Sequence, residues 1–305
     1  MKITVIGAGA MGSLYGGYLS TRHDVLLVDT DKSKVEALNQ TGLSISEPDG
    51  STKAYPIKAA SETKNIEAQD LVIIFVKALF TESALKNNLS LFGPETYVLS
   101  LQNGAGHQDV LMKYVKKDHV IIGTTQHNAA FLNPGAIRHG GQGITCIGNL
   151  SGETESLEKF KSAFEECGFP IELSNNIGKL IWHKLFTNVT LSALTGVLQV
   201  PMGYITQDAY TWSMAKMLLK EAVAVAKADG HDFDEALLLT EIEAVSKKSP
   251  EGQTSIFADL RDGRRTEVDT ISGFIVRKAE QTGVLAPTHA FLVNMVHAME
   301  NKNMN

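Results

Sequence analysis

The sequence predicts a two-domain fold in which an α/β domain precedes an all-α domain, and three observations support it. A glycine-rich turn stands between an apolar run at residues 3–6 and a helical stretch. Further short apolar runs then alternate with helical stretches up to about residue 174. Beyond that point, apolar residues recur with the 3.6-residue spacing of helices. We therefore expect an α/β domain over residues 1–174 and a helical domain over residues 175–305, with a cleft between them.

The N-terminal turn reads G-A-G-A-M-G over residues 7–12. In such a turn Gly7 makes the tight bend, Gly9 lets a pyrophosphate approach the backbone, and Gly12 lets the helix pack closely on the strand. The helix that begins here offers unpaired N–H groups and the positive end of its dipole to phosphates. Because the motif follows one apolar strand and precedes another, it predicts a Rossmann-type dinucleotide-binding domain in preference to a purely structural turn.

Asp29 follows the second apolar run, at residues 25–28. At this strand end a carboxylate accepts hydrogen bonds from the hydroxyls of the adenosine ribose and repels a 2′-phosphate, although Asp is also common at the start of a turn. Arg22, Lys32 and Lys34 stand close enough in the sequence to meet a phosphate. The local pattern therefore favours NADH and leaves NADPH open.

The remaining elements of the first domain follow in order. Apolar runs rich in β-branched residues at 71–76, 97–101 and 119–122 are typical of strands buried on both faces of a parallel sheet. Two short β-like runs within residues 132–149 predict a hairpin, and a helix at 154–167 and a strand at 171–173 close the domain. Lys77 and the N-G-A-G turn beginning at Asn103 follow strand ends, where open α/β sheets bind ligands. Lys77 can meet a phosphate or carboxylate and Asn103 a ribose or nicotinamide group, although N-G-A-G is also a plain turn sequence.

Composition narrows the classes of ligand. The chain has 305 residues, 43% of them hydrophobic, and a formal net charge of −6, which suits two packed domains and gives no support for a nucleic-acid surface. No apolar run is long enough for a membrane span, and the first residues have a buried-strand pattern, so we expect a cytoplasmic protein with a small-molecule ligand. Cys146 and Cys167 lack the spacing of metal ligands, and we expect two buried thiols and no metal.

The best candidate for a proton donor is Lys184, within I-W-H-K-L-F-T-N at residues 181–188. On a helix, Lys184, Asn188 and Ser192 form one polar stripe at four-residue spacing. Apolar neighbours predict that this helix is buried, and burial would lower the pKa of the lysine and make it a better proton donor. The alternative is a lysine that reaches water at a cleft rim. His183 faces another side of the helix and is expected to be a packing or surface residue.

A second polar constellation covers residues 255–269 and reads S-I-F-A-D-L-R-D-G-R-R-T-E-V-D. Ser255 and Asp259 stand four residues apart, Gly263 is expected to end their helix, and Glu267 to begin another. By themselves these arginines and carboxylates favour the alternative interpretation, a salt-bridged loop.

Taken together, the motifs at 7–12, 76–77, 103–106, 182–188 and 255–269 resemble those of the ketopantoate reductase family over essentially the whole chain. The specific part is S-x-x-x-D followed by T-E-V-D and Gly273-Phe274, since other hydroxyacid dehydrogenases share G-x-G-x-M-G and K-x-x-x-N. The resemblance implies a Rossmann domain and an all-α domain with the active site in the cleft between them. It makes Lys184 the general acid and implies that Glu267 contacts the cofactor or orients the lysine. The implied substrate-binding residues are Asn188, Ser192, Ser255 and Asn103, and the implied cofactor-binding residues are Gly7, Ala8, Gly9, Ala10, Met11, Gly12, Asp29, Lys77, Asn103, Ala129 and Glu267.

The reaction that the resemblance implies is reduction of 2-dehydropantoate to (R)-pantoate by NADPH or NADH, a step toward coenzyme A. Two positions depart from the family pattern: Ser192-Ala193 replaces a common Asn-Pro, and Asp29-Thr30 stands where NADPH-using members carry an Arg. Both departures also suit an NAD-dependent D-2-hydroxyacid dehydrogenase acting on branched 2-keto acids. A non-catalytic dinucleotide-binding sensor is a further alternative. The retained residues argue against it: Lys184, Asn188, Ser255 and Glu267. The oligomeric state stays open, with a homodimer as one option.

Overall fold

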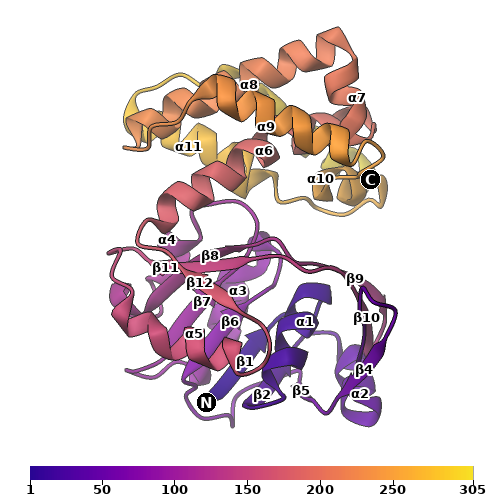
Figure 1. The fold of residues 1–305 in the computed structure, drawn as a ribbon, viewed down its shortest axis with the longest axis vertical. Coiled ribbons are helices and arrows are strands. Elements are labelled where there is room, and N and C mark those ends of the chain that lie inside the picture. The colour runs from indigo at the N-terminus through magenta and orange to yellow at the C-terminus, as the bar shows by residue number, and fades with distance from the viewer. Residues whose placement is uncertain (305) are drawn as a thin grey trace. The chain divides into compact units, whose positions relative to one another are not determined.

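The first strand of the chain, β1 (Lys2–Ile6), lies inside an eight-stranded sheet with the strand order β12-β11-β8-β7-β6-β1-β2-β5. The structure is a computed structural model that describes residues 1–304, and it divides into two compact units. We call residues 1–102 and 107–178 the α/β unit, and residues 103–106 together with 179 onward the helical unit. Figure 1 shows the strands in the indigo-to-magenta part of the chain and the long helices in the orange and yellow part.

Six strands of the large sheet, from β5 across to β8, run parallel. Their apolar side chains are buried on both faces, as the β-branched runs predicted; all four residues of β6 are buried, for example. β11 joins β8 in the antiparallel sense, and β12 runs parallel to β11. The strands are β2 (Asp24–Val28), β5 (Lys58–Ala60), β6 (Leu71–Ile74), β7 (Tyr97–Ser100), β8 (Val120–Thr125), β11 (Thr145–Asn149) and β12 (Ile171–Leu173).

Strand β1 has β2 on one side and β6 on the other, so strands were added to the sheet on both sides of β1. This arrangement creates a topological switch point at the carboxyl ends of these strands, where open α/β sheets bind ligands. The helices of this unit are α1 (Ala10–Leu19), α2 (Lys32–Thr41), α3 (Thr81–Asn87), α4 (His107–Leu111) and α5 (Glu158–Glu165). Short 3-10 turns are η1 (Ala78–Phe80), η2 (Leu89–Leu91), η3 (Lys117–His119) and η4 (Glu155–Leu157).

A second sheet of four strands, in the order β4-β3-β10-β9, contacts α1. Its strands are β3 (Leu43–Ser46), β4 (Thr52–Tyr55), β9 (Asn128–Asn133) and β10 (Ala136–Gly141). The predicted hairpin is therefore present, but it joins β9 to β10 around Gly135, whose φ is 83°. The later part of the predicted hairpin segment, residues 145–149, is instead β11 of the large sheet, where it pairs with β8 in the antiparallel sense.

The helical unit contains no strand among its described residues, as the 3.6-residue spacing predicted. Its core is formed by apolar side chains from α6, α8, α11 and α12 together with parts of the shorter helices. The elements are α6 (Ile177–Leu198), whose first two residues belong to the α/β unit, α7 (Met202–Gln207), α8 (Ala209–Ala228), α9 (Glu235–Lys248), α10 (Ser255–Arg261), the 3-10 turn η5 (Val268–Thr270), α11 (Ser272–Thr282) and α12 (Pro287–Met304).

The N-G-A-G turn at residues 103–106 packs within the helical unit. The backbone N–H of Ala105 donates to the carbonyl of Thr270 at 2.8 Å. Gly104 has a φ of 88°, and a Cβ at this position would overlap the Thr270 carbonyl oxygen. The second residue of the turn must therefore be glycine, for its backbone conformation and for its close approach to η5.

Candidate functional site

The glycine turn of the α/β unit has the geometry that its sequence predicted. Gly7 adopts a φ of 105° and donates its N–H to the carbonyl of Val28 at 2.8 Å. A Cβ on Gly12 would overlap the carbonyl oxygen of Gly7, so this glycine allows α1 to pack against the turn. A Cβ on Gly9, in contrast, would meet no protein atom within 4 Å. Two glycines therefore serve the fold, and the third leaves open space above the start of a helix, which suits a pyrophosphate.

Asp29 connects the end of β2 to this turn. Its Oδ2 accepts hydrogen bonds from the N–H of Ala8 at 3.0 Å and from Nζ of Lys34 at 2.8 Å, and its Oδ1 accepts from the N–H of Asp31 at 3.0 Å. The side chains of Asp29 and Lys34 are only 13% and 17% exposed. The sequence left Lys34 open as a partner for a phosphate. In the structure Lys34 is paired with the carboxylate of Asp29, the group expected to face the ribose.

A cavity of about 450 Å³ lies against the carboxyl ends of β1 and β2 in the α/β unit. Gly7 and Asp29 line it together with two segments that the sequence analysis missed. One follows β5 and contributes Ser61, Glu62 and Lys64; the other contributes Phe80, Ser83, Ala84 and Asn87 from η1 and α3. These two segments carry no motif, and the sequence shows only that each follows a strand of the parallel sheet. The cavity offers an apolar wall beside carboxylates, which suits an adenosine group.

Lys77 lies directly before η1 and is half-buried. Its carbonyl accepts a hydrogen bond from the N–H of Phe80 at 2.8 Å. The buried Gln102 donates from Nε2 to the carbonyl of Val76 at 2.6 Å and to Oγ1 of Thr81 at 2.8 Å. Gln102 thus fixes the segment that carries Lys77, a role that its place just past a strand end could have suggested.

Three further residues expected at the cofactor pack against the core of the α/β unit. Ala10 and Met11, at the start of α1, are partly buried against the same core cluster as Ala129 of β9. Since α1 contacts β9, the small sheet borders the helix whose N-terminus faces the open space above Gly9.

The polar stripe of Lys184, Asn188 and Ser192 lies on α6, as predicted. The neighbouring side chains are almost fully buried; Phe186 and Val189 are 0% exposed. Lys184 and Asn188 are half-buried, and Ser192 is 4% exposed. Burial lowers the pKa of the Lys184 ammonium, and the carboxylate of Glu267 opposes this lowering. The helical unit therefore holds a desolvated lysine beside one compensating carboxylate, which is the environment of a proton donor.

Glu267 precedes the 3-10 turn η5, close to the helix start predicted for it. Its carbonyl accepts from the N–H of Thr270 at 3.1 Å and from the Thr270 hydroxyl at 3.2 Å. Thr270 also receives the N–H of Ala105, so the turn that carries Asn103 packs on the segment that carries Glu267. The helical unit thus gathers the Asn103 turn, Glu267 and Lys184 from three separate stretches of sequence.

Ser255 is the exposed first residue of α10, and it is tied to Ser192 through two threonines. Thr254 caps α10 by accepting the N–H of Phe257 at 3.2 Å, and its hydroxyl lies 2.8 Å from that of the fully buried Thr195. The Thr254 hydroxyl also donates to the carbonyl of Ser192 at 3.3 Å. The two serines expected at the substrate therefore lie on helices that a partly buried hydroxyl pair holds together.

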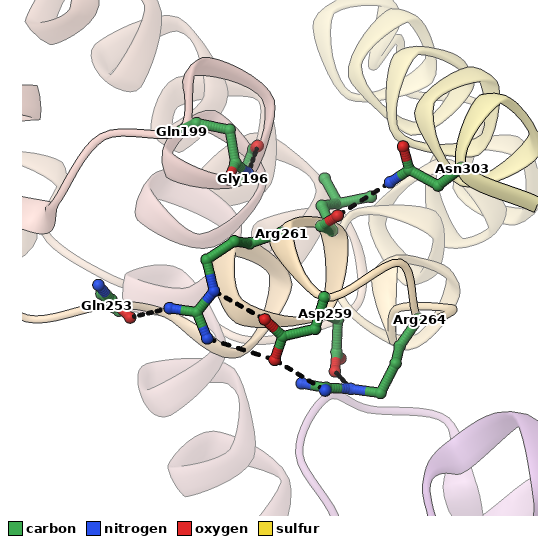
Figure 2. Close-up of polar contacts among 9 residues, drawn as sticks. Gly196, Gln199, Gln253, Asp259, Arg261, Arg264 and Asn303 are labelled. Atoms are coloured by element: carbon green, nitrogen blue, oxygen red, sulfur yellow. Dashed lines mark hydrogen bonds and ion pairs between the residues drawn. The ribbon is translucent and has the colours of Figure 1, made fainter.

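The arginines and carboxylates after Ser255 form the salt-bridged loop that was the alternative interpretation. Figure 2 shows Arg261 and Arg264 converging on the end of α10, with Arg261 reaching Gln253. Arg264 bonds the buried Asp259 at 3.0 Å and Asp262 at 2.7 Å. This network closes the loop around Gly263, whose φ is 68°. We assign these charges to the fold of the loop that leads to Glu267.

The other candidates lie elsewhere. His183 is exposed and pairs with Glu241 at 2.8 Å, as expected for a surface residue. Cys167 is buried, but Cys146 is only half-buried, because it lies near the end of the sheet beside Glu172; the prediction of two buried thiols was wrong for it. Within residues 1–304, no group of His, Cys, Asp and Glu side chains could hold a metal ion, and no helix is long and apolar enough to cross a membrane.

Comparison with known proteins gives consistent matches over the full chain. Two family models match: Ketopantoate reductase PanE/ApbA over residues 3–152, and its C-terminal counterpart over residues 176–300. The 2-dehydropantoate 2-reductase of Lactococcus lactis subsp. lactis (strain IL1403) is 33% identical over 98% of both chains.

Solved structures agree with this result. The ternary structure of a D-mandelate dehydrogenase with NADH and anilino(oxo)acetate has a TM-score of 0.92 and 30% identity, covering 100% of both chains. A PanE/ApbA family ketopantoate reductase from Ralstonia eutropha JMP134 has a TM-score of 0.91 and 29% identity, also over 100% of both chains.

Proposed function

The chain belongs to the ketopantoate reductase family of NAD(P)-dependent oxidoreductases, and from this premise we propose that it reduces the C2 carbonyl of 2-dehydropantoate to give (R)-pantoate. The observation that carries the proposal is Lys184: a desolvated lysine beside the carboxylate of Glu267, on the same helix stripe as Asn188 and Ser192. A carbonyl reduction needs a proton at the oxygen, and this is the group in the helical unit best suited to supply it.

Features of the α/β unit alone support binding of a dinucleotide. The open space above Gly9, the uncapped start of α1 and the cavity beside Asp29 fit the pyrophosphate and adenosine groups. Once bound, the reduced nicotinamide supplies a hydride to C2 of the keto acid. In this proposal Ala8, Lys77 and Ala129 of the α/β unit border the cofactor.

Lys184 donates a proton from Nζ to the carbonyl oxygen as negative charge develops there, and becomes a neutral amine. Its lowered pKa favours this transfer because the neutral form is the one that burial stabilises. The opposing charge of Glu267 keeps the lysine protonated until the substrate arrives. The Asn188 amide and the hydroxyls of Ser192 and Ser255 offer hydrogen bonds to the oxygens of the substrate.

We propose NADH as the preferred cofactor. Asp29 and Glu62 place two carboxylates at the cavity, and their negative charge disfavours binding of a 2′-phosphate. Lys34 pairs with Asp29 and Lys64 with Glu62, and these positive charges weaken the repulsion. We therefore expect a moderate preference for NADH over NADPH.

A second candidate function is an NAD-dependent D-2-hydroxyacid dehydrogenase that acts on branched 2-keto acids. Two observations favour it: Ser192-Ala193 replaces the common Asn-Pro of the family, and the chain is similar to a D-mandelate dehydrogenase solved with NADH. Lys184 would be the general acid in this reaction too.

An initial-rate screen tests both candidates. Purified protein is assayed with 2-dehydropantoate, 2-ketoisovalerate and phenylglyoxylate, each with NADH and with NADPH. We expect the highest kcat/KM for 2-dehydropantoate with NADH. A higher value for either of the other keto acids would replace the first candidate by the second, and turnover of none of the three would contradict both.

A further inference from the structure

Glu267 is carried by a segment with little regular structure of its own. Residues 261–265 are exposed, and η5 is a 3-10 turn of only three residues. Such short turns have poor hydrogen-bond geometry and persist mainly through contacts with their surroundings. The position of the Glu267 carboxylate therefore depends on what holds this segment from outside.

Two side chains of the C-terminal helix α12 hold it. Oε1 of Glu300 accepts the backbone N–H of Thr266 at 2.7 Å, and Oε2 of Glu300 lies 2.9 Å from Nδ1 of His297. Nε2 of His297 lies 3.1 Å from Oδ1 of Asp269. We call these four residues the α12 brace. The brace holds the chain one residue before Glu267 and again two residues after it.

Glu300 and Thr266 are the buried part of the brace, whereas His297 is half-buried and Asp269 is exposed. The brace carries complementary charge. Glu300 and Thr266 are each 6% exposed, so the N–H of Thr266 would lose its acceptor with little access to water if Glu300 were removed. Burial acts to raise the pKa of Glu300, but the hydrogen bonds from Thr266 and His297 outweigh it and hold the pKa below its usual range. Burial likewise acts to lower the pKa of His297, and the carboxylates of Glu300 and Asp269 raise it above its usual value.

We propose that Glu300 and His297 are positioning residues, which hold the Glu267 carboxylate toward Lys184 and thereby keep that lysine charged until it donates its proton. This inference rests on the proposed function for the part that Lys184 plays in turnover. The charged groups that act on the brace histidine among the described residues are Asp269 from η5 and Glu300 from α12, and the one that acts on Lys184 is Glu267.

The test measures the protonation of Lys184 without turnover. Competitive acylation with acetic anhydride at a series of pH values, followed by peptide mass spectrometry, gives the midpoint at which Lys184 becomes reactive. Glu300→Ala removes both contacts of the carboxylate, and we expect the midpoint to fall by about one pH unit as Glu267 loses its position. Glu300→Gln keeps an acceptor for the N–H of Thr266, so its acylation midpoint should stay close to that of the wild-type protein. His297→Ala should lower the midpoint by less than Glu300→Ala.

Glu221→Ala is the matched control. The Glu221 carboxylate accepts the backbone N–H groups of Thr288 at 3.0 and 3.1 Å and of His289 at 3.1 Å, so it makes the same kind of contact at the other end of α12. This variant should lower the melting temperature and leave the Lys184 midpoint where it is. A midpoint that moves as far in Glu221→Ala as in Glu300→Ala would overturn the proposal, since general loosening of α12 would then explain both.

The pH profile of kcat, measured on the same variants, separates this inference from the proposed function. We expect the high-pH decline of kcat to move with the acylation midpoint. A midpoint that does not move in folded Glu300→Ala protein would overturn the role of the brace; if that variant does not fold, the same criterion applies to His297→Ala. A midpoint that moves while the kcat profile stays fixed would support the brace and reject Lys184 as the general acid.

Discussion

The carboxylate of Asp29 accepts a hydrogen bond from the backbone N–H of Ala8 at 3.0 Å, which joins the residue that follows β2 to the glycine turn that follows β1. The same oxygen also receives Nζ of Lys34 at 2.8 Å. Asp29 therefore helps to shape the glycine turn and also supplies negative charge at the cavity where an adenosine group fits. These two functions can be separated by substitutions.

We expect Asp29→Asn to narrow the preference for NADH over NADPH roughly tenfold, because removing one charge near a partly exposed 2′-phosphate changes the interaction by about 1 to 2 kcal/mol. The amide can still accept the N–H of Ala8, so the turn should persist. The ratio of kcat/KM values for the two cofactors measures the effect. Asp24→Asn, at the other end of β2, removes an exposed carboxylate paired with Lys58 and should leave the ratio unchanged. A wild-type preference for NADPH would contradict the role given to Asp29.

Gly9→Ala and Gly12→Ala should fail in different ways. The new Cβ at Gly9 meets no protein atom, so we expect a normal melting temperature and dinucleotide binding weakened tenfold or more, roughly 1.4 kcal/mol, by the lost approach to phosphate. The new Cβ at Gly12 overlaps the Gly7 carbonyl and should cost about 1 to 3 kcal/mol of stability. Thermal unfolding and fluorescence titration with NADH distinguish the two. Unchanged NADH affinity in Gly9→Ala would show that the phosphates bind elsewhere.

Lys184→Ala should lower kcat by about 10²-fold or more while NADH still binds, since a general acid acts on the chemical step. Steady-state kinetics and a binding titration give the two quantities. Lys179→Ala provides the matched control, because Lys179 lies on the same helix and is exposed. Near-normal turnover in Lys184→Ala would show that Lys184 is not the general acid.

Glu267→Gln should shift the high-pH decline of kcat to lower pH. In the reductive direction Lys184 must be protonated, so kcat is full below the pKa of Lys184 and is lost as the pH rises through it. Burial already lowers this pKa and the Glu267 charge raises it, so removing that charge lowers it further. The measurement is the pH dependence of kcat at saturating substrate. A decline that stays in place would mean that Glu267 acts on the cofactor and not on the lysine.

His289 should make the protein less stable in mild acid. Its side chain is 0% exposed, and burial lowers its pKa to about 4, from an unfolded value of about 6.5. The unfolded chain therefore binds more protons between these values; the stability is complete above pH 6.5 and is lost as the pH falls toward 4. Between pH 7.5 and 5.0 we expect a loss of roughly 2 kcal/mol from this residue. Urea unfolding should show that loss in wild-type protein and in the exposed-site control His183→Gln, and should not show it in His289→Gln.

Local patterns were enough to predict where part of the candidate site lies in the fold. The turn at residues 7–12, Asp29 and the stripe on α6 each depend on residues close together in the sequence, whose conformation follows from strand or helix periodicity. The hairpin was predicted less well, because the sequence of residues 145–149 does not show which strand they pair with, and the pairing with β8 places them in the large sheet.

Residues far apart in the sequence were not predicted. The segments that complete the cavity, with Glu62 and Phe80 among them, carry no motif and become neighbours only because parallel strands end at one edge of the sheet. The contact of Glu300 with Thr266 spans 34 residues and links two elements with no shared periodicity. Glu300 is the single acidic residue in the sequence of α12, but nothing near it in the sequence shows that its partner is Thr266.

The sequence by itself predicted the fold class, the family and the candidate lysine, because glycine geometry and hydrophobic spacing act over a few residues at a time. Only the tertiary structure decided what surrounds these groups. It paired Asp29 with Lys34, docked the Asn103 turn on Thr270 and placed α12 behind Glu267. The physical reason is that charge and hydrogen bonding at a site depend on distance and burial, which a chain acquires only when remote segments pack.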